Sequence, residues 1–409
     1  MVSTGSTAQR AATLAVIVAA LGYFVDIYDL ILFSMVRVPS LTELGVAPDH
    51  QLGEFKHMLS MQMGGMLVGG IIWGVLGDKR GRLSVLFGSI TLYSIANIAN
   101  GLVHTLPAYS AWRMVAGIGL AGELGAGITL VSELMGKDSR GVGTTLVAGL
   151  GVSGGLLAGA IGGAFPSIPH PSWRVAYFIG GGLGLGLLIL RIGVVESGMF
   201  HGLRGKVVSR GNFFRLFTSG RRFLRYIAVI LVGVPIWFVI AIPVSASKEL
   251  GAALGLSPPP NPATATFFCY GACTLGGLAS GLLSQKLRSR RRALAVFLGL
   301  TTLSLVLYFT LGGTSTAVMY ALCAFIGFAS GYWAVFVSTA AELFGTNLRA
   351  TVTTTVPNFV RGSVPVLLAV WTGTVASAIG IGAVLLVLAF IGLFTLKETF
   401  GVDLDFTEE

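Results

Sequence analysis

Residues 74–83 read GVLGDKRGRL, a short polar stretch between two long apolar ones. Its glycines permit a tight turn, and Asp78 can lie beside the positive N-terminal end of the helix that follows. Lys79, Arg80 and Arg82 favour the cytoplasmic side of a membrane, where lysine and arginine are concentrated. The stretch therefore predicts a short cytoplasmic hairpin between two membrane-spanning helices.

The apolar character of the hairpin's flanks extends over the whole chain. Of its 409 residues, 54% are hydrophobic and 11% are charged, and the mean hydropathy is +0.83. Soluble domains contain about 25% charged residues, so this composition indicates an integral membrane protein. A helix needs about 20 apolar residues to cross the hydrocarbon core. Such stretches lie near residues 11–36, 54–76, 83–103, 108–134, 141–164, 174–195, 223–245, 263–284, 292–312, 315–340, 350–374 and 377–396. We therefore expect an all-α fold of twelve transmembrane helices, the first of which is too long and too acidic for a cleaved signal peptide.

The distribution of positive charge predicts that both termini are cytoplasmic. Under that orientation four of the 27 lysines and arginines lie outside and two lie within spans, while the others lie in inner loops or at inner helix ends. The outer four are Arg37, Lys56, Arg174 and Lys248, and the two within spans are Arg113 and Arg361. This positive-inside bias is typical of a multi-pass protein of the cell membrane, and it favours anionic lipid over nucleic acid as the charged partner.

Three cysteines, Cys269, Cys273 and Cys323, all fall within predicted spans. No histidine or acidic residue lies near them, so we expect neither a disulfide framework nor a metal site. No phosphate-cradling loop and no nucleophile with its base stands out either, so an enzyme is not expected.

One long polar connection divides the spans into two groups of six. Residues 201–222 read HGLRGKVVSRGNFFRLFTSGRR, and the phenylalanines among the cations suggest an amphipathic helix on the inner leaflet. We expect a six-helix bundle at residues 1–196, a cytoplasmic linker at residues 197–222, and a second six-helix bundle with a short cytoplasmic tail at residues 223–409.

An internal repeat supports this division. Glu133 and Arg140 recur as Glu342 and Arg349, each pair at the inner end of the fourth span of its half. Two pseudo-symmetric bundles related by an axis along the membrane normal would give this pattern.

The stretch GVLGDKRGRL closely resembles the signature loop of the major facilitator superfamily. The twelve expected spans, the central loop and this repeat extend the resemblance over nearly the whole chain. The resemblance implies that the acid of the loop and the repeated Glu and Arg residues form networks that latch one conformation. By position, that role falls to Asp78, Arg82, Glu133, Arg140, Glu342 and Arg349. The equivalent loop of the second half, SQKLRSRRRA, lacks the Gly-Asp core, which puts its part of the latch in question.

Two further segments resemble proton symporters within that superfamily. GYFVDIYDLILFS at residues 22–34 and RMVAGIGLAGELGAGITLVSEL at residues 113–134 are similar to the first and fourth helices of symporters for phosphate, metabolites and aromatic acids. ELFGTNLRATVTTTVPNFVRGSVP at residues 342–365 is similar to the region of the tenth and eleventh helices in organic ion transporters.

Ionisable side chains within the apolar spans are the candidate working parts. Asp26, Asp29 and Glu123 lie in spans where a bare carboxylate costs roughly 2.5 to 3.5 kcal/mol on insertion scales. We therefore expect each to face a protein interior, take up a proton or meet a cation. Arg113 and Arg361 are the candidate partners, and they also suit an anionic substrate because guanidinium grips carboxylate or phosphate in two places. Asp26 or Glu123 would carry the proton, and purely structural ion pairs remain the alternative.

Polar and aromatic side chains near these charges are candidates for the wall of a substrate cavity. Packing or interface anchoring is the alternative for each of them. They are Tyr23, Tyr28, Gln62, Asn97, Trp237, Tyr270, Tyr332, Trp333 and Asn358.

Together these patterns predict a monomeric, proton-coupled symporter of a small anionic metabolite, with the proton as coupling ion and no other cofactor. A proton-coupled sugar or polyol symporter using Asp26 is one alternative. A proton-driven exporter of cationic or amphipathic compounds is another, and a non-transporting receptor on the same fold is a third.

Overall fold

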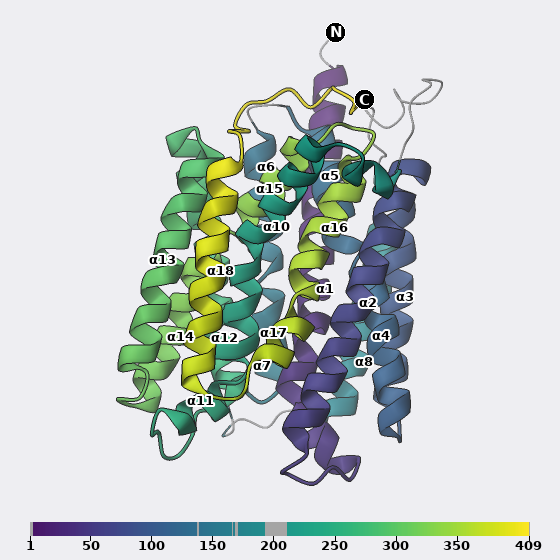
Figure 1. Cartoon of the computed structure of the whole chain (residues 1–409). Helices are drawn as coiled ribbons and strands as arrows, with labels where there is room; N and C mark the ends of the chain where they lie inside the picture. The colour runs from purple at the N-terminus through teal and green to yellow at the C-terminus, as the bar shows by residue number, and fades with distance from the viewer. Residues whose placement is uncertain (1–2, 137–138, 166, 168–170, 193–210, 409) are drawn as a thin grey trace.

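The computed structural model describes residues 3–136, 139–165, 167, 171–192 and 211–408, and every regular element among them is helical. The first half contains α1 (Ser3–Glu43), α2 (Gln51–Arg80), α3 (Arg82–Leu102), α4 (Leu106–Leu120), α5 (Glu123–Leu134), α6 (Arg140–Gly151), α7 (Gly154–Ile161) and α8 (Trp173–Leu190). The second half contains the 3-10 helix η1 (Phe213–Phe217), α10 (Gly220–Val239), the π-helix η2 (Ile240–Val244), α11 (Ser247–Ala253), α12 (Pro262–Leu287), α13 (Arg290–Leu311), α14 (Thr316–Ser330), α15 (Trp333–Leu343), α16 (Arg349–Gly362), α17 (Val364–Val370) and α18 (Val375–Thr395). The helices form one bundle with both termini at the same end, which we call the terminal end (Figure 1).

The predicted all-helical membrane architecture is confirmed. Within the described residues, eleven helical stretches are long and apolar enough to cross a membrane. Four of these stretches are built by consecutive pairs: α4 with α5, α6 with α7, α10 with η2, and α14 with α15. The expected span at residues 350–374 is also a pair, α16 and α17, which are separated at Ser363 and are individually shorter than a full crossing.

The two halves use the same close packing of their second and fourth spans. In the first half, a Cβ added to Gly117 of α4 would lie 2.0 Å from the carbonyl oxygen of Gln62 in α2. In the second half, a Cβ on Gly327 of α14 would lie 2.0 Å from the carbonyl oxygen of Cys269 in α12. Only glycine permits helix backbones to approach this closely, which accounts for the glycine-rich fourth span and supports the internal repeat.

The halves meet through two equivalent pairs of helices, α2 with α16 and α6 with α12. A Cβ on Gly74 would lie 2.9 Å from Cα of Thr351, and a Cβ on Gly277 would lie 3.0 Å from Cα of Gly149. The helix backbones of the two halves are therefore in close contact at both pairs.

Helix breaks occur beside these contacts. The α4–α5 break is at Ala121 and Gly122, the α14–α15 break is at Gly331 and Tyr332, and the α16–α17 break is at Ser363. Irregular backbone is tolerated at membrane depth only where protein covers it or where it lines a cavity. The breaks therefore mark the interior of the bundle as the place to look for a site.

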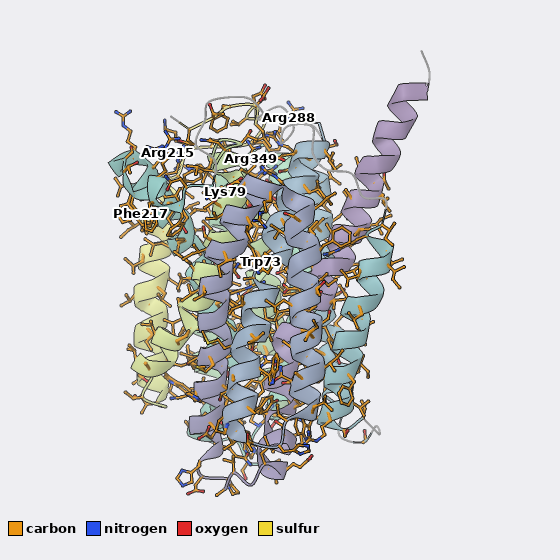
Figure 2. The ribbon with its side chains drawn as sticks, turned by 90° about the vertical axis from the view of Figure 1, so that its right-hand side faces the viewer. Trp73, Lys79, Arg215, Phe217, Arg288 and Arg349 are labelled. Atoms are coloured by element: carbon orange, nitrogen blue, oxygen red, sulfur yellow. The ribbon has the colours of Figure 1, made fainter. Side chains whose placement is uncertain are left out.

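Most of the expected linker at 197–222 lies outside the described residues, so its amphipathic helix stays a prediction. In the described part, η1 buries Leu216 completely and leaves Phe214 76% exposed. Figure 2 shows Arg215 and Phe217 of this element at the terminal end, at a level similar to Lys79.

Candidate functional site

The centre of the bundle brings together one ion pair from the two halves. Asp26 of α1 lies with a carboxylate oxygen 3.7 Å from a guanidinium nitrogen of Arg361 in α16. The same guanidinium donates a hydrogen bond of 3.3 Å to the hydroxyl of Tyr23 and one of 3.4 Å to the side-chain oxygen of Asn358. All four side chains are at most 1% exposed. Residues more than 300 positions apart in the sequence thus share one enclosed polar cluster.

Aromatic rings surround the guanidinium of Arg361. The rings of Trp237 in α10 and Trp333 in α15 lie 5.5 Å and 5.4 Å from it, within the range of cation–π attraction. The indole N–H of Trp333 donates a hydrogen bond of 2.7 Å to the hydroxyl of Tyr23. Tyr270 of α12 is buried nearby, and its hydroxyl has no hydrogen-bond partner within the described part of the chain.

The carboxylate of Asp26 is under-satisfied. Neither of its oxygens accepts a hydrogen bond from any described residue, and Arg361 is its one ion-pair partner among them. A buried charge without hydrogen bonds is costly, and such a group in a folded protein needs a physical explanation. A proton or a bound ligand would supply what the side chain lacks.

Glu123 has a different partner from those expected. Its carboxylate accepts a hydrogen bond from Arg191, the residue that caps the C-terminus of α8, and both side chains are 1% exposed. Arg191 also donates to the carbonyl oxygen of Leu86 in α3. The carboxylate of Glu123 lies directly against Gly22 of α1, where a Cβ would be only 1.9 Å from it. This pair is therefore internal to the first half, one helical turn from Asp26.

Sequence reasoning missed Arg191. It lies near the end of the stretch 174–195, which we expect to span the membrane, and a basic residue at the end of a span is ordinary. The available signal was an arginine immediately after the glycine-rich apolar run of α8, with no other charge in the helix beyond Arg174.

Arg113 and Asp29 also lie within the first half and do not join the central cluster. Arg113 donates to the side-chain oxygen of Gln62 and, at 3.4 Å, to the hydroxyl of Tyr177. The carboxylate of Asp29 faces the amide of Asn97, and none of these oxygen and nitrogen atoms has a hydrogen bond of normal geometry in the described residues.

Two of the expected wall residues are explained by packing. The hydroxyl of Tyr28 donates to the carbonyl oxygen of Ala176 at 2.8 Å. The hydroxyl of Tyr332 donates to the carbonyl oxygen of Val232 at 3.0 Å. Both contacts tie neighbouring helices of a single half together.

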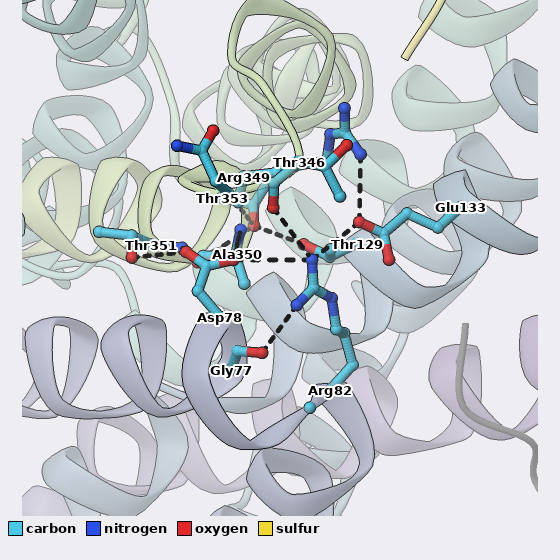
Figure 3. Close-up of polar contacts among 12 residues, drawn as sticks. Gly77, Asp78, Arg82, Thr129, Glu133, Thr346, Arg349, Ala350, Thr351 and Thr353 are labelled. Atoms are coloured by element: carbon cyan, nitrogen blue, oxygen red, sulfur yellow. Dashed lines mark hydrogen bonds and ion pairs between the residues drawn. The ribbon is translucent and has the colours of Figure 1, made fainter. Parts of the chain in front are cut away.

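Six residues expected to form the latch gather at the terminal end, as Figure 3 shows for four of them. Glu133 accepts hydrogen bonds from Arg82 of its own half at 2.8 Å and from Arg349 of the other half at 3.1 Å. Asp78 accepts from the backbone N–H groups of Ala350 and Thr351 at 3.1 and 2.8 Å. A carboxylate at these N–H groups satisfies donors that the first turn of α16 leaves unpaired, and it complements the helix dipole.

The second half builds an equivalent cluster without the Gly-Asp core. Glu342 accepts from Arg290 of its own half at 2.9 Å and lies 3.5 Å from Arg140 of the other half. Arg290 takes the place that Arg82 has in the first cluster, and it was not among the expected latch residues. Hydroxyl pairs repeat the symmetry at 2.6 Å and 2.8 Å: Thr129 with Thr353, and Ser338 with Thr144.

The C-terminal tail covers both clusters. Arg140 donates to the carbonyl oxygen of Val402, and Arg349 donates to that of Leu404 at 2.5 Å. Further along, the backbone N–H of Glu408 donates to the side-chain oxygen of Asn347 at 2.8 Å. Leu404 is 1% exposed, so the tail is packed into the terminal end.

Contacts between the halves also occur at the end opposite the termini. Arg37 of α1 pairs with Glu249 of α11 at 3.2 Å, and Lys56 of α2 donates to the carbonyl oxygen of Leu368 in α17 at 3.4 Å. A cavity of about 10 Å³, room for about one water, lies between the halves beside Trp237. The central cluster is therefore closed off towards both ends in this structure.

No group of three or more metal-binding side chains occurs within the part of the chain that the structure describes. The three cysteines are buried and unpaired. What the central cluster offers chemically is a guanidinium, a carboxylate and hydroxyl and indole groups, which suit the binding of a small polar molecule and a proton.

A family model described as the Major Facilitator Superfamily matches residues 13–369. The chain belongs to the major facilitator superfamily. The transporter is 27% identical to a putative metabolite transport protein of Haemophilus influenzae. The match covers 96% of this chain and 97% of that protein. It is 28% identical to the 3-(3-hydroxy-phenyl)propionate transporter of Escherichia coli, in a match that covers 71% of this chain and 72% of that protein.

The transporter also superposes on a solved structure, that of a proton:xylose symporter bound to 6-bromo-6-deoxy-D-glucose. The TM-score is 0.75 at 17% identity, over 97% of this chain and 98% of the other, which shows a shared fold. The predicted family and fold are confirmed. The transporter is a multi-pass membrane protein that carries small metabolites, and it is not an enzyme.

Proposed function

We propose that the transporter is a proton-coupled symporter of a small anionic metabolite, with Asp26 as the proton carrier and Arg361 as the anion-binding residue. The observation that carries this proposal is the under-satisfied carboxylate of Asp26, 3.7 Å from Arg361 at the junction of the two halves. Glu123 is the weaker candidate, because it already has Arg191 as a hydrogen-bonded partner.

Coupling follows from competition for one guanidinium. When Asp26 is charged, it attracts Arg361 and weakens the hold of Arg361 on an anion. When Asp26 binds a proton, Arg361 is released to bind a carboxylate or phosphate group in its place. Proton and substrate then bind with positive coupling, and typical coupling free energies of about 1 to 3 kcal/mol correspond to a 5- to 150-fold change in affinity.

Alternating access would proceed by exchanging the contacts at the two ends. Opening the terminal end requires that Arg349 leave Glu133 and that Arg140 leave Glu342, while the aromatic wall keeps the substrate between the halves. We assign the terminal end to the cytoplasm of a cell membrane, because exposed cations such as Lys79 and Arg288 lie there (Figure 2).

The relatives support an acidic substrate. The Escherichia coli relative is named for 3-(3-hydroxy-phenyl)propionate, which combines a carboxylate with an aromatic ring. Arg361 would bind such a carboxylate, and Trp237 and Trp333 would contact the ring.

A sugar or polyol remains the second candidate, because the same two indoles offer the apolar faces on which a sugar ring stacks. The two candidates differ in what they require of Arg361. A neutral sugar does not need a guanidinium, whereas a carboxylate bound in two places does.

The test is uptake by proteoliposomes under an imposed pH gradient. The probes are 3-(3-hydroxyphenyl)propionate, inorganic phosphate and D-xylose. A gradient of one pH unit supports about tenfold accumulation for each coupled proton. Asp26→Asn should reduce this accumulation to equilibration while counterflow continues, and Arg361→Gln should abolish transport of an anionic probe.

Asp29→Asn is the matched comparison, since Asp29 is on the same helix, equally buried, and away from Arg361. It should still accumulate the probe. If Asp26→Asn accumulates normally, or if only Asp29→Asn stops accumulation, Asp26 is not the proton carrier. If D-xylose alone is transported, the anionic substrate class is wrong.

A further inference from the structure

A groove runs along the outer surface of the second half between α13 and α18. Its upper part, at the terminal end, is a cavity of about 540 Å³ lined by Arg288, Arg291 and Arg292 together with Phe394 of α18. Its lower part is an apolar cavity of about 490 Å³ that begins at Thr302 of α13. We call the two together the α13–α18 groove.

The two parts adjoin along α18. Phe394 lines the upper cavity and Phe390 lines the lower one, and their rings are stacked with centroids 6.4 Å apart. Phe394 is 71% exposed and Val387, further down the groove, is 60% exposed. On a membrane-spanning transporter, such apolar side chains on the outer surface face lipid chains.

The upper part carries a net positive charge, because three arginines and one carboxylate line it. None of its three arginines has an acidic partner within ion-pair distance among the described residues. One acid lies there, Glu398, and because its hydrogen bonds come from neutral groups, its negative charge offsets one of the three positive charges. Its carboxylate accepts from the hydroxyl of Ser289 and from the backbone N–H groups of Arg290 and Arg291 at 2.8 and 3.4 Å, which caps the N-terminus of α13.

The distance from the charged part of the groove to the start of the apolar part matches one leaflet of a bilayer. Half of a hydrocarbon core about 30 Å thick is about 15 Å, which corresponds to about ten residues of helix. Ten residues separate Arg292, at the charged part, from Thr302, where the lower cavity begins. An acyl chain whose headgroup lies at Arg292 would therefore pass Phe394 and Phe390 and end where the lower cavity begins.

We propose that the α13–α18 groove binds one anionic phospholipid of the leaflet at the terminal end. The phosphate and the negative headgroup lie against Arg288, Arg291 and Arg292, and one acyl chain follows Phe394 and Phe390 down to the bilayer centre. A free phosphate ion would use only the charged part, whereas a phospholipid uses both parts of the groove.

Native mass spectrometry of the full chain in detergent tests this proposal. Phosphatidylglycerol and phosphatidylethanolamine with identical acyl chains are titrated separately, and the dissociation constant of the first bound lipid is measured. Each basic residue near a membrane surface strengthens anionic lipid binding by about 1 kcal/mol, or about fivefold. The Arg291→Gln/Arg292→Gln variant should therefore bind phosphatidylglycerol about 25-fold more weakly, with phosphatidylethanolamine little changed.

The matched control is Lys79→Gln/Arg80→Gln, which removes two exposed charges from the same end of the other half. It should keep phosphatidylglycerol affinity within about threefold of the unmodified chain. Inorganic phosphate at millimolar concentration should not displace the bound lipid.

Three results would overturn the proposal. The first is an unmodified chain that binds the two lipids equally, which is decisive whether or not the variants fold. The second is an equal loss of phosphatidylglycerol affinity in both double variants, which would indicate that the lipid responds to the overall positive charge of this end and not to one site. The third is displacement by inorganic phosphate, which indicates a phosphate site without a lipid chain.

Discussion

The buried pair of Glu123 and Arg191 makes a quantitative prediction that separates a structural role from proton transfer. Both side chains are 1% exposed, and they come from α5 and from the end of α8. The perturbation is a double-mutant cycle with Glu123→Gln, Arg191→Met and the combined variant. Each single change leaves one charged group in the interior without its partner.

The expected size follows from that burial. Removing one member of a buried ion pair destabilises a protein by about 3 to 5 kcal/mol, because the remaining charge is uncompensated. The combined variant buries no charge at this place. Besides the pair itself it loses the hydrogen bond from Arg191 to the carbonyl oxygen of Leu86, at about 1 to 3 kcal/mol. The two changes should therefore be strongly non-additive, with a coupling free energy of at least about 3 kcal/mol.

The assay is reversible unfolding of the purified transporter in mixed micelles containing a denaturing detergent. Arg174 and Glu43, an ion pair at 3.0 Å with side chains 21% and 51% exposed, provide the control cycle. That cycle should give a coupling of at most about 1 kcal/mol, as surface pairs do.

The same variants are then assayed for uptake under a pH gradient. If the pair is structural, the combined variant accumulates substrate while Asp26→Asn does not. Additive single effects in the cycle would refute the argument from buried charge. Loss of accumulation in a stably folded combined variant would instead make Glu123 a proton carrier.

Two further predictions concern closure and pH. Gly125→Ala should lower the ratio of molecules closed at the terminal end to molecules open there by a factor of about 5 to 150. Its Cβ would lie 2.2 Å from the hydroxyl oxygen of Thr354 across the halves, and overpacking costs about 1 to 3 kcal/mol. Cysteine labelling of the terminal end should increase, while Gly186→Ala, with no neighbour within 4 Å, should behave as the unmodified chain. Burial raises the pKa of Glu398, but hydrogen bonds from Ser289 and from backbone N–H groups outweigh it and lower the pKa below its ordinary value of 4.5. A lowered pKa in the folded state gives stability that is present above pH 4.5 and is lost as the pH falls through the lowered pKa. Thermal unfolding measured from pH 6 downward should therefore show a shallower loss for Glu398→Gln than for the unmodified chain, and equal slopes would contradict the capping role.

Much of the fold could be predicted because it depends on patterns local to the chain. Apolar length indicates a span whatever the neighbouring helices do, and the repeated Glu-x6-Arg at residues 133–140 and 342–349 fixes the correspondence of the halves. The pairing of Asp26 with Arg361 was also partly predictable, since Arg113 and Arg361 are the two cations that the sequence places within spans and a buried carboxylate needs a cation.

Partner choice could not be predicted in the same way. Whether Glu123 meets Arg113, Arg191 or Arg361 depends on the rotation of each helix about its axis, which glycine packing sets and which composition does not reveal. Arg290 is hidden for another reason, because SQKLRSRRRA offers several arginines and only the bend at Arg288, with its left-handed backbone, selects the one that turns inward.

The tail that packs over the terminal end has a consequence for biosynthesis. Residues 402–408 contact Arg140, Arg349 and Asn347, so this seal consists partly of a segment that the ribosome makes after the transmembrane helices described above. A nascent chain whose transmembrane helices are already inserted still lacks that portion. During translation the terminal end must therefore be held by the clusters around Glu133 and Glu342 alone, together with the pair of Arg37 and Glu249 at the opposite end.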